Sequence, residues 1–195
     1  MTTEATHLPT PTPDLVCTYI QQFDQQQVTV EAALTKLFQY APNNIALEDV
    51  LLKVVTLNSL YATGILATYT VAEHIHRCKV DADLQVGDPA IVHVIAKVQI
   101  GAKVRNNYSF ASKYCAWHNP TVYPIYDSFV DQMLWEYQKL DRFATFRRQD
   151  LWDYPTFAQV VAQFRAHYRL TEFSLKEIDK YLWSAGQQRY PRVWS

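Results

Sequence analysis

Glycine is scarce in this chain, which has only four glycines among its 195 residues. Glycine-rich turns let backbone N–H groups approach a phosphate in Walker loops and in GxGxxG dinucleotide-binding turns. Neither motif occurs, and the serine-hydrolase elbow and the HExxH pair of metalloproteases are missing as well. The sequence therefore gives no sign of a nucleotide-binding loop or of these two hydrolase classes.

Cysteines and long apolar runs are also few. The three cysteines Cys17, Cys78 and Cys115 are odd in number and lack CxxC spacing, which is typical of reduced thiols and predicts a cytoplasmic location. No apolar run approaches the roughly 18–20 residues that cross a bilayer, and we recognise no signal peptide. We therefore expect no membrane association.

His74, His76 and Cys78 form the one cluster that suggests metal ligands. On a helix, however, residues two apart point in different directions, so only His74 and Cys78 share a face. A tetrahedral metal site needs three or four converging ligands, and no second cluster supplies them. We predict no metal site and no cofactor.

The chain is rich in apolar residues, which make up 49% of it and recur at helical spacing. Residues 1–13 are rich in proline and threonine and lack this helical spacing. We therefore predict that they form a disordered leader. We expect residues 14–195 to form a single all-α domain, a compact globule of eight to nine helices, because no segment alternates as a strand would. The predicted helices cover about residues 14–23, 29–38, 47–61, 65–77, 90–98, 109–118, 129–140, 156–168 and 175–185. The third, apolar nearly all round, is expected at the centre of the core, whereas residues 83–87 and 101–108 are predicted to be a turn and a polar connection.

The stretch from residue 109 to residue 130, SFASKYCAWHNPTVYPIYDSFV, carries the strongest functional signal. Ser109 has the character of a helix N-cap, which would place Lys113 in the first turn of a short helix. Asn119 and Pro120 end that helix, because proline lacks an N–H and disfavours a helical residue before it. Asp127 then caps the next helix. One lysine and one aspartate thus lie near two helix N-termini joined by a short loop.

Each of these two residues has a purely structural interpretation as well. An aspartate at an N-cap is routine, so Asp127 need do nothing more than cap its helix. A lysine in a first helical turn is disfavoured by the helix dipole unless an anion is near. No acidic residue lies between Asp88 and Asp127, whereas Lys103 and Arg105 do. This basic window is compatible with phosphate binding and equally with an ordinary solvated face.

The order of these elements resembles that of the helix-hairpin-helix DNA glycosylases over about residues 45–140. The likeness consists of a central apolar helix that ends in a polar turn, a later helix that carries Lys113, and a proline-hydrophobic run before Asp127. The glycines of that family's hairpin are replaced here by Ser109 and Ala111.

The resemblance implies an all-α protein that binds DNA, flips a base out of the duplex and excises it. Asp127 would stabilise the oxocarbenium-like state of the sugar, and Lys113 would be the Schiff-base nucleophile of members that also cleave the strand. The residues assigned to nucleic-acid binding are Lys103, Arg105, Asn106, Asn107, Ser109 and Ser112, with Asn58 and Tyr61 as wedges in the minor groove. Those assigned to the base pocket are Tyr114, Trp117, Tyr123 and Tyr126.

Two other functions agree with the same residues. One is a non-enzymatic all-α module that binds nucleic acid or protein, in which Asp127 is only a cap. The other is an enzyme on a different substrate, in which Lys113 and Asp127 act as an acid and base pair. All three hypotheses depend on whether these two side chains face one cavity.

Overall fold

The structure is a computed structural model that describes residues 8–191. Over these residues the chain is mostly helical, as predicted, with nine α-helices, one 3-10 helix and one antiparallel two-stranded hairpin. The elements are α1 (Pro13–Tyr40), α2 (Leu47–Leu60), α3 (Thr68–Cys78), α4 (Asp81–Val86), α5 (Ile91–Ala96), β1 (Lys97–Ile100), β2 (Lys103–Asn106), α6 (Tyr108–His118), α7 (Ser128–Asp141), η1 (Arg148–Trp152), α8 (Tyr154–His167) and α9 (Leu175–Arg189).

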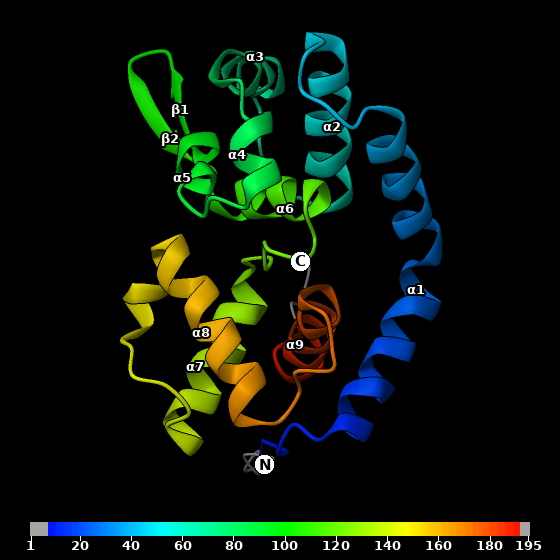
Figure 1. The fold of residues 1–195 in the computed structure, drawn as a ribbon, viewed down its shortest axis with the longest axis vertical. Helices are drawn as coiled ribbons and strands as arrows, with labels where there is room; N and C mark the ends of the chain where they lie inside the picture. The colour runs from blue at the N-terminus through cyan, green and yellow to red at the C-terminus, as the bar shows by residue number, and fades with distance from the viewer. Residues whose placement is uncertain (1–7, 192–195) are drawn as a thin grey trace.

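The helices form two groups in space (Figure 1). Helices α2 to α6 and the hairpin make one group, and α7, α8 and α9 make the other. Helix α1 runs along one side of both groups and packs on α9 as well as on α2 and α6. The loop from α6 to α7 crosses from one group to the other, so residues on this loop lie near the boundary between them.

Helix α1 is continuous where two helices were predicted. Thr12 is its N-cap, with the side-chain oxygen accepting a hydrogen bond from the Leu15 N–H, and Pro13 occupies the first turn. Thr29 has the character of a second N-cap, but residues 24–28 contain no glycine or proline to stop the helix. Because nothing breaks it, the helix runs on for 28 residues.

The described part of the predicted leader is packed against the fold. Leu8 is 8% exposed and belongs to the hydrophobic core. The Tyr137 hydroxyl donates a hydrogen bond to the Pro9 carbonyl at 3.0 Å. Because of these contacts, the prediction of a disordered leader is wrong for residues 8–13. Residues 1–7 lie outside the described residues.

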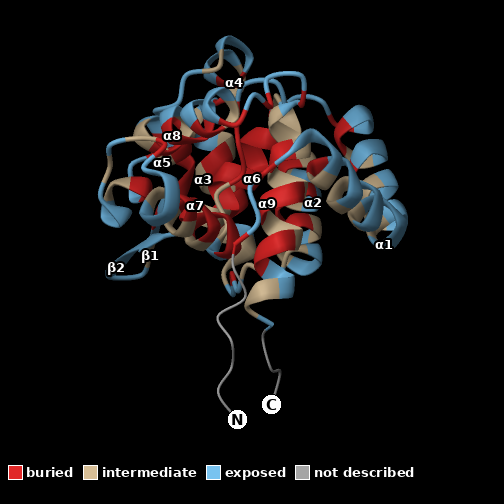
Figure 2. Cartoon of the chain, turned by 90° about the horizontal axis from the view of Figure 1, so that it is seen from below, coloured by how far each residue is buried: buried red, intermediate tan, exposed pale blue. Residues whose placement is uncertain are grey.

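Helix α6 occupies the centre of the core, a position that we expected for α2. Eight of the eleven residues of α6 are buried. Helix α2 begins where predicted and ends one residue earlier, but Leu52 and Val55 on its outer face are 51% and 44% exposed. In Figure 2 the buried residues of α6, α7 and α9 lie in the interior, whereas the outer face of α1 is exposed. Within the described chain, no helix is both long enough and apolar enough to cross a bilayer.

A β-hairpin forms where a helix end and a polar connection were predicted. Lys97 to Ile100 pair with Lys103 to Asn106, and Gly101 adopts φ +58° in the turn between them. Val98 is the one fully buried side chain of the two strands. Strands this short leave too little alternation to recognise in the sequence. Similarly, the turn predicted over residues 83–87 is largely helical. Helix α4 covers Asp81–Val86, and Gly87, with φ +76°, is its C-cap.

Gly186 lies inside α9, although we expected it to end that helix. A Cβ at this position would lie 2.7 Å from the Phe129 Cβ and 3.2 Å from the Met133 Cγ of α7. The glycine therefore allows the backbones of α7 and α9 to approach closely, and its role is packing.

The substitution Gly186→Ala tests this close approach. Alanine is the better helix former, so intrinsic propensity alone would stabilise α9 by about 1 kcal/mol. We expect the overlap with Phe129 to outweigh that gain and to lower the free energy of unfolding by about 1–3 kcal/mol. Urea denaturation measures the change, with the exposed neighbour Gln187→Ala as the control. A stabilised Gly186→Ala variant would contradict the packing role.

Candidate functional site

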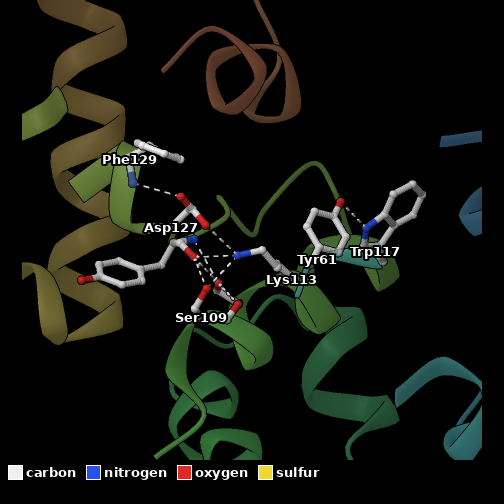
Figure 3. A network of polar contacts seen from close by, with 8 residues as sticks. Tyr61, Ser109, Lys113, Trp117, Asp127 and Phe129 are labelled. Carbon is white, nitrogen blue, oxygen red and sulfur yellow. Dashed lines mark hydrogen bonds and ion pairs between the residues drawn. The ribbon is translucent and has the colours of Figure 1, made fainter. Parts of the chain in front are cut away.

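Lys113 lies in the middle of α6, buried to 2% exposure, and not in the first turn that we predicted. Its Nζ donates to the Ser109 Oγ at 2.7 Å, to the Tyr126 carbonyl at 3.3 Å and to the Asp127 Oδ2 at 3.3 Å. Figure 3 shows this network between α6 and the loop that leads to α7. The structure thus brings together the two side chains on which the sequence hypotheses depend.

Asp127 is both a helix cap and the partner of Lys113. Its Oδ1 accepts a hydrogen bond from the Phe129 N–H at 2.9 Å, as the N-cap prediction required. Its Oδ2 faces Lys113, and 20% of the side chain is exposed. A helix N-terminus and an ammonium group both favour a negative charge at this position. The carboxylate is therefore fixed in orientation and still accessible.

The two serines of α6 hold the α6–α7 loop in place. The helix begins at Tyr108 without a side-chain cap, so Ser109 is not the N-cap that we predicted. The Ser109 Oγ donates to the Tyr126 carbonyl, and the Ser112 Oγ accepts from the Tyr126 N–H at 2.9 Å. Because both hydroxyls are engaged inside the protein, these contacts replace the nucleic-acid contacts assigned to Ser109 and Ser112.

Lys113 and Asp127 lie in the wall of a cavity of about 390 Å³. One face of α1 and one face of α9 form much of its lining. Tyr61, which follows α2 directly, and Phe129 at the start of α7 also contribute to it. The lining residues of α9 recur at helical spacing on one side of the helix: Lys176, Asp179, Lys180, Trp183 and Gln187. Those of α1 are Phe23, Gln27, Val30 and Glu31.

The lysines of α9 bind acidic residues of α1 across the cavity. Lys176 forms an ion pair with Glu31 and lies 4.1 Å above the centroid of the Trp117 ring. Lys180 lies 2.5 Å from an Asp24 carboxylate oxygen and 3.7 Å from Glu31. These pairs tie α1 to α9 and balance most of the charge at this wall.

Asp179 is the acidic residue of the cavity that has no such partner. Part of the residue reaches the cavity surface, but its Oδ1 is inaccessible to solvent and has no hydrogen-bond partner among the described residues. Burial is the main cause that raises the pKa of this carboxyl, and with Lys113 and Lys176 opposing the shift and Asp127 and Glu31 adding to it, the pKa reaches about 8. Asp179 is therefore mainly a neutral carboxylic acid at pH 7.

Of the aromatic residues assigned to the site, Tyr61 lines this cavity. Lys113 Nζ lies 5.4 Å from the centroid of its ring, and its hydroxyl accepts a hydrogen bond from the Trp117 Nε1 at 3.0 Å. Burial raises the pKa of the Tyr61 hydroxyl. Trp117 and Tyr123 line a neighbouring cavity of about 290 Å³, and the Tyr123 hydroxyl donates to the Asp88 carbonyl.

Three other predicted site residues make contacts elsewhere. Tyr114 is fully buried, and its hydroxyl donates to the Asn44 Oδ1. The Tyr126 hydroxyl donates to the Asp131 Oδ2 at 3.0 Å, away from Lys113. Asn58 closes the turn after α2, because its side chain both donates to and accepts from the backbone of Ile65. Tyr114 and Tyr126 therefore do not line the cavity beside Lys113, and the Asn58 side chain is engaged in its own turn.

The basic residues assigned to phosphate binding lie on the hairpin and outside the cavity. Lys103, Arg105 and Asn106 are exposed on β2, and Asn107 is half-buried with its Nδ2 lacking a partner among the described residues. Lys103, Arg105 and Asn106 are therefore accessible to a partner, but none of the four residues is part of the Lys113 site.

The sequence reasoning missed the contribution of α9. Lys176, Asp179, Lys180 and Trp183 share one face of a helix whose opposite face carries buried residues such as Ile178 and Leu182. The sequence does carry a signal for this face: a row of charged residues with one tryptophan, on a helix that starts at a capping box. The sequence does not predict which helices this face of α9 contacts.

In the cluster of His74, His76 and Cys78, for which we predicted no metal site, the His74 Nε2 and the Cys78 Sγ lie 3.8 Å apart. Over residues 8–191, no three histidine, cysteine or acidic side chains are arranged to hold a metal ion.

Comparison with known proteins relates the chain to one family. The family model HI_0787_N, described as an N-terminal domain, matches residues 15–122. An uncharacterized protein from Haemophilus influenzae is 40% identical over 154 residues, which cover 78% of this chain and 74% of the relative. No solved structure matches the chain. The segment matched by the family model contains Tyr61 and Lys113 and ends before Asp127 and α9.

The substitution Asp179→Asn tests the raised pKa through stability. Between pH 4 and pH 8 the folded state holds a proton on Asp179 that the unfolded chain has lost, since the ordinary pKa is 3.8 and the folded value is about 8. The contribution of the wild-type Asp179 to the free energy of unfolding therefore falls as the pH rises from 4 to 8. We expect the variant and the wild type to melt together near pH 4, with the variant more stable by at least about 1.4 kcal/mol at pH 8.

Thermal unfolding at both pH values measures this difference, and the exposed Glu172→Gln is the matched control. A gap between Asp179→Asn and wild type that is the same at both pH values would show that Asp179 titrates normally.

Proposed function

The chain belongs to the HI_0787_N family, and for this member we propose that it is a DNA glycosylase of the helix-hairpin-helix type. The observation that carries this conclusion is the Lys113–Asp127 pair, 3.3 Å apart in the wall of a cavity with aromatic residues in its lining. A carboxylate at such a place can stabilise the sugar during base excision, and an amine beside it can act as the nucleophile of an enzyme that also cleaves the strand.

The cavity suits a flipped base in size and in lining. Its volume of about 390 Å³ falls within the usual range for small-molecule sites. The rings of Phe23, Tyr61, Phe129 and Trp183 contribute to its walls. Aromatic faces stack on bases and recover part of the few kcal/mol that unstacking a base costs.

Asp127 has the role of stabilising charge on the sugar. When the bond between C1′ and the base nitrogen breaks, its electron pair leaves with the base and positive charge develops on the deoxyribose. The Asp127 carboxylate is already oriented by the Phe129 N–H and by Lys113. A charge that is preorganised in this way stabilises the transition state without further rearrangement.

Lys113 has the role of the nucleophile. Its nitrogen adds to C1′ and, as the sugar ring opens with a proton on the ring oxygen, becomes the nitrogen of a Schiff base. The ammonium must lose one proton before it can attack, and the departing base must gain one. Ser109 and the Tyr126 carbonyl hold the nitrogen at the cavity wall until the substrate arrives.

The turn after α2 is the part of the surface proposed to enter the DNA. Tyr61 and Ala62 line the cavity, and Leu66 further along the same turn is 99% exposed. An apolar side chain at such a position can insert between base pairs and hold the duplex open. This assigns the wedge to Leu66 in place of Asn58, while Lys103 and Arg105 are available for phosphate contacts.

The substitution Asp127→Asn tests the catalytic carboxylate. Asparagine is also a good N-cap, so the fold should persist. On a panel of duplex oligonucleotides, each with one damaged or mismatched base, we expect release of the accepted base to fall by a factor of about 10² or more. Binding to the same duplexes should change little. Glu136→Gln on α7 is the control and should retain wild-type release.

If Asp127→Asn releases the base as fast as the wild type, Asp127 is only a helix cap. If the wild type binds the duplexes but releases no base from any of them, the protein is a binding module.

Borohydride reduction tests Lys113 separately. Reduction converts a Schiff base into a stable amine, so wild-type protein should become covalently attached to the DNA strand. We expect no adduct with Lys113→Gln and a normal yield with the exposed Lys36→Gln. Denaturing gel electrophoresis separates the adduct from free DNA. Base release without any adduct would make Lys113 a positioning residue for Asp127.

A further inference from the structure

We propose that Asp179 is the general acid of this site, a protonated carboxyl that gives its proton to the departing base. This inference rests on the proposed function and extends it to a residue outside the segment that resembles the glycosylases. It also assigns a substrate class, namely bases that are uncharged in the DNA and need a proton in order to leave.

The contacts of Asp179 differ from those of the other carboxyls that line the cavity. Asp127 accepts from Lys113 and from the Phe129 N–H, and Glu31 is paired with Lys176 and Lys180. The Asp179 Oδ1 is buried and has no partner within residues 8–191, although the residue lines the same cavity. A buried polar atom without a partner calls for an explanation, and a ligand in the adjoining cavity would satisfy it.

The surroundings of Asp179 keep the proton on it. Burial is the largest of the causes that together raise the pKa of the carboxyl to about 8. An ionised Asp179 would add negative charge close to Asp127 and Glu31. The charged and titratable groups that line the cavity with it are Glu31 on α1, Tyr61 after α2, Lys113 on α6, Asp127 before α7, and Lys176 and Lys180 on α9 itself.

Two carboxyls in different states can divide the chemistry of glycosidic cleavage. The ionised one stabilises the cationic sugar, and the neutral one protonates the leaving group. As the bond to C1′ breaks, its electron pair moves to the base and the Asp179 proton transfers to a base nitrogen or oxygen. The products of this step are a neutral free base, an oxocarbenium-like sugar beside Asp127, and an Asp179 carboxylate.

The carboxylate formed in this way can then accept the proton that Lys113 must lose. The positive charge of Lys113 is the strongest of the charges that favour ionised Asp179. Transfer of the ammonium proton to Asp179 leaves an amine that adds to C1′ and returns Asp179 to its protonated state. Over both steps the base gains one proton, Lys113 loses one and Asp179 is unchanged.

The test compares leaving groups that do and do not need a proton. Each uncharged purine lesion in the duplex panel is paired with its N7-methylated counterpart, which is already cationic and leaves as a neutral base. With Asp179→Asn, we expect release of the uncharged base to fall by about 10² or more, since general acids contribute about 10²–10⁴. Release of the cationic base should fall by less than about fivefold, because no acid is required.

The pH profile gives a second readout. Wild-type release of the uncharged base should decline as pH rises through about 8, where Asp179 loses its proton. Asp179→Asn should lack this decline, and the wild-type rate on the cationic base should not show it. The carbon-13 chemical shift of the Asp179 carboxyl measures its protonation directly, without any substrate, and should be that of the acid at pH 6.

The possible outcomes separate the two proposals. If the wild type releases bases but Asp179→Asn slows both members of a pair equally, or neither, Asp179 is not the general acid. An ionised Asp179 at pH 6 overturns the role whatever the rates are. If the wild type releases no base from either member of any pair, the proposed function has failed, and this inference fails with it.

Discussion

One ammonium group, the Nζ of Lys113, lies almost wholly out of water, and the surrounding structure supplies what that burial requires. An ion removed from solvent costs several kcal/mol unless oxygen atoms replace its hydration. Ser109, the Tyr126 carbonyl and Asp127 provide those oxygens. Two of these oxygens, those of Tyr126 and Asp127, come from the loop between α6 and α7. Burial of the Lys113 charge therefore determines the path of this loop and the starting point of α7.

The same constraint extends to the other wall of the cavity. Because Asp127 caps α7, Phe129 is placed where Gly186 of α9 can pack against it. The close approach of α7 and α9 then brings the polar face of α9, with Asp179 and Trp183, to Lys113. Ion pairs from α9 to α1 close the remaining side. The stability lost by burying an unpartnered carboxyl at Asp179 is typical of a site arranged for chemistry and not for stability.

Two local signals predicted the structure correctly. The end of α6 before Asn119-Pro120 and the cap at Asp127 are confirmed, because each depends on residues that are close in the chain. The cap predicted at Ser109 was wrong, because α6 already begins at Tyr108. The hairpin was missed because four-residue strands carry little pattern. The single long α1 was missed because a cap-like threonine does not stop a helix that continues on both sides.

The site was predicted in part for the same reason. Lys113 and Asp127 were identified from one short stretch and Tyr61 from the turn after α2, whereas the other rings around them were not. Neighbouring residues on a helix point about 100° apart, so Tyr114 turns into the core although Lys113 beside it faces the cavity. Asp179 and Trp183 come from a helix more than 45 residues further along the chain, and only tertiary packing brings them to Lys113.

The most direct test of the central claim is the affinity for a sugar that carries the charge of the transition state. A duplex containing a pyrrolidine in place of one deoxyribose has a cationic nitrogen near the position of C1′, and a tetrahydrofuran at the same position is its neutral match. If Asp127 stabilises an oxocarbenium-like sugar, the wild-type protein should bind the cationic duplex tighter by a factor of about 10² or more, and Asp127→Asn should lose most of this preference. Equal affinity of the wild type for the two duplexes would contradict the account.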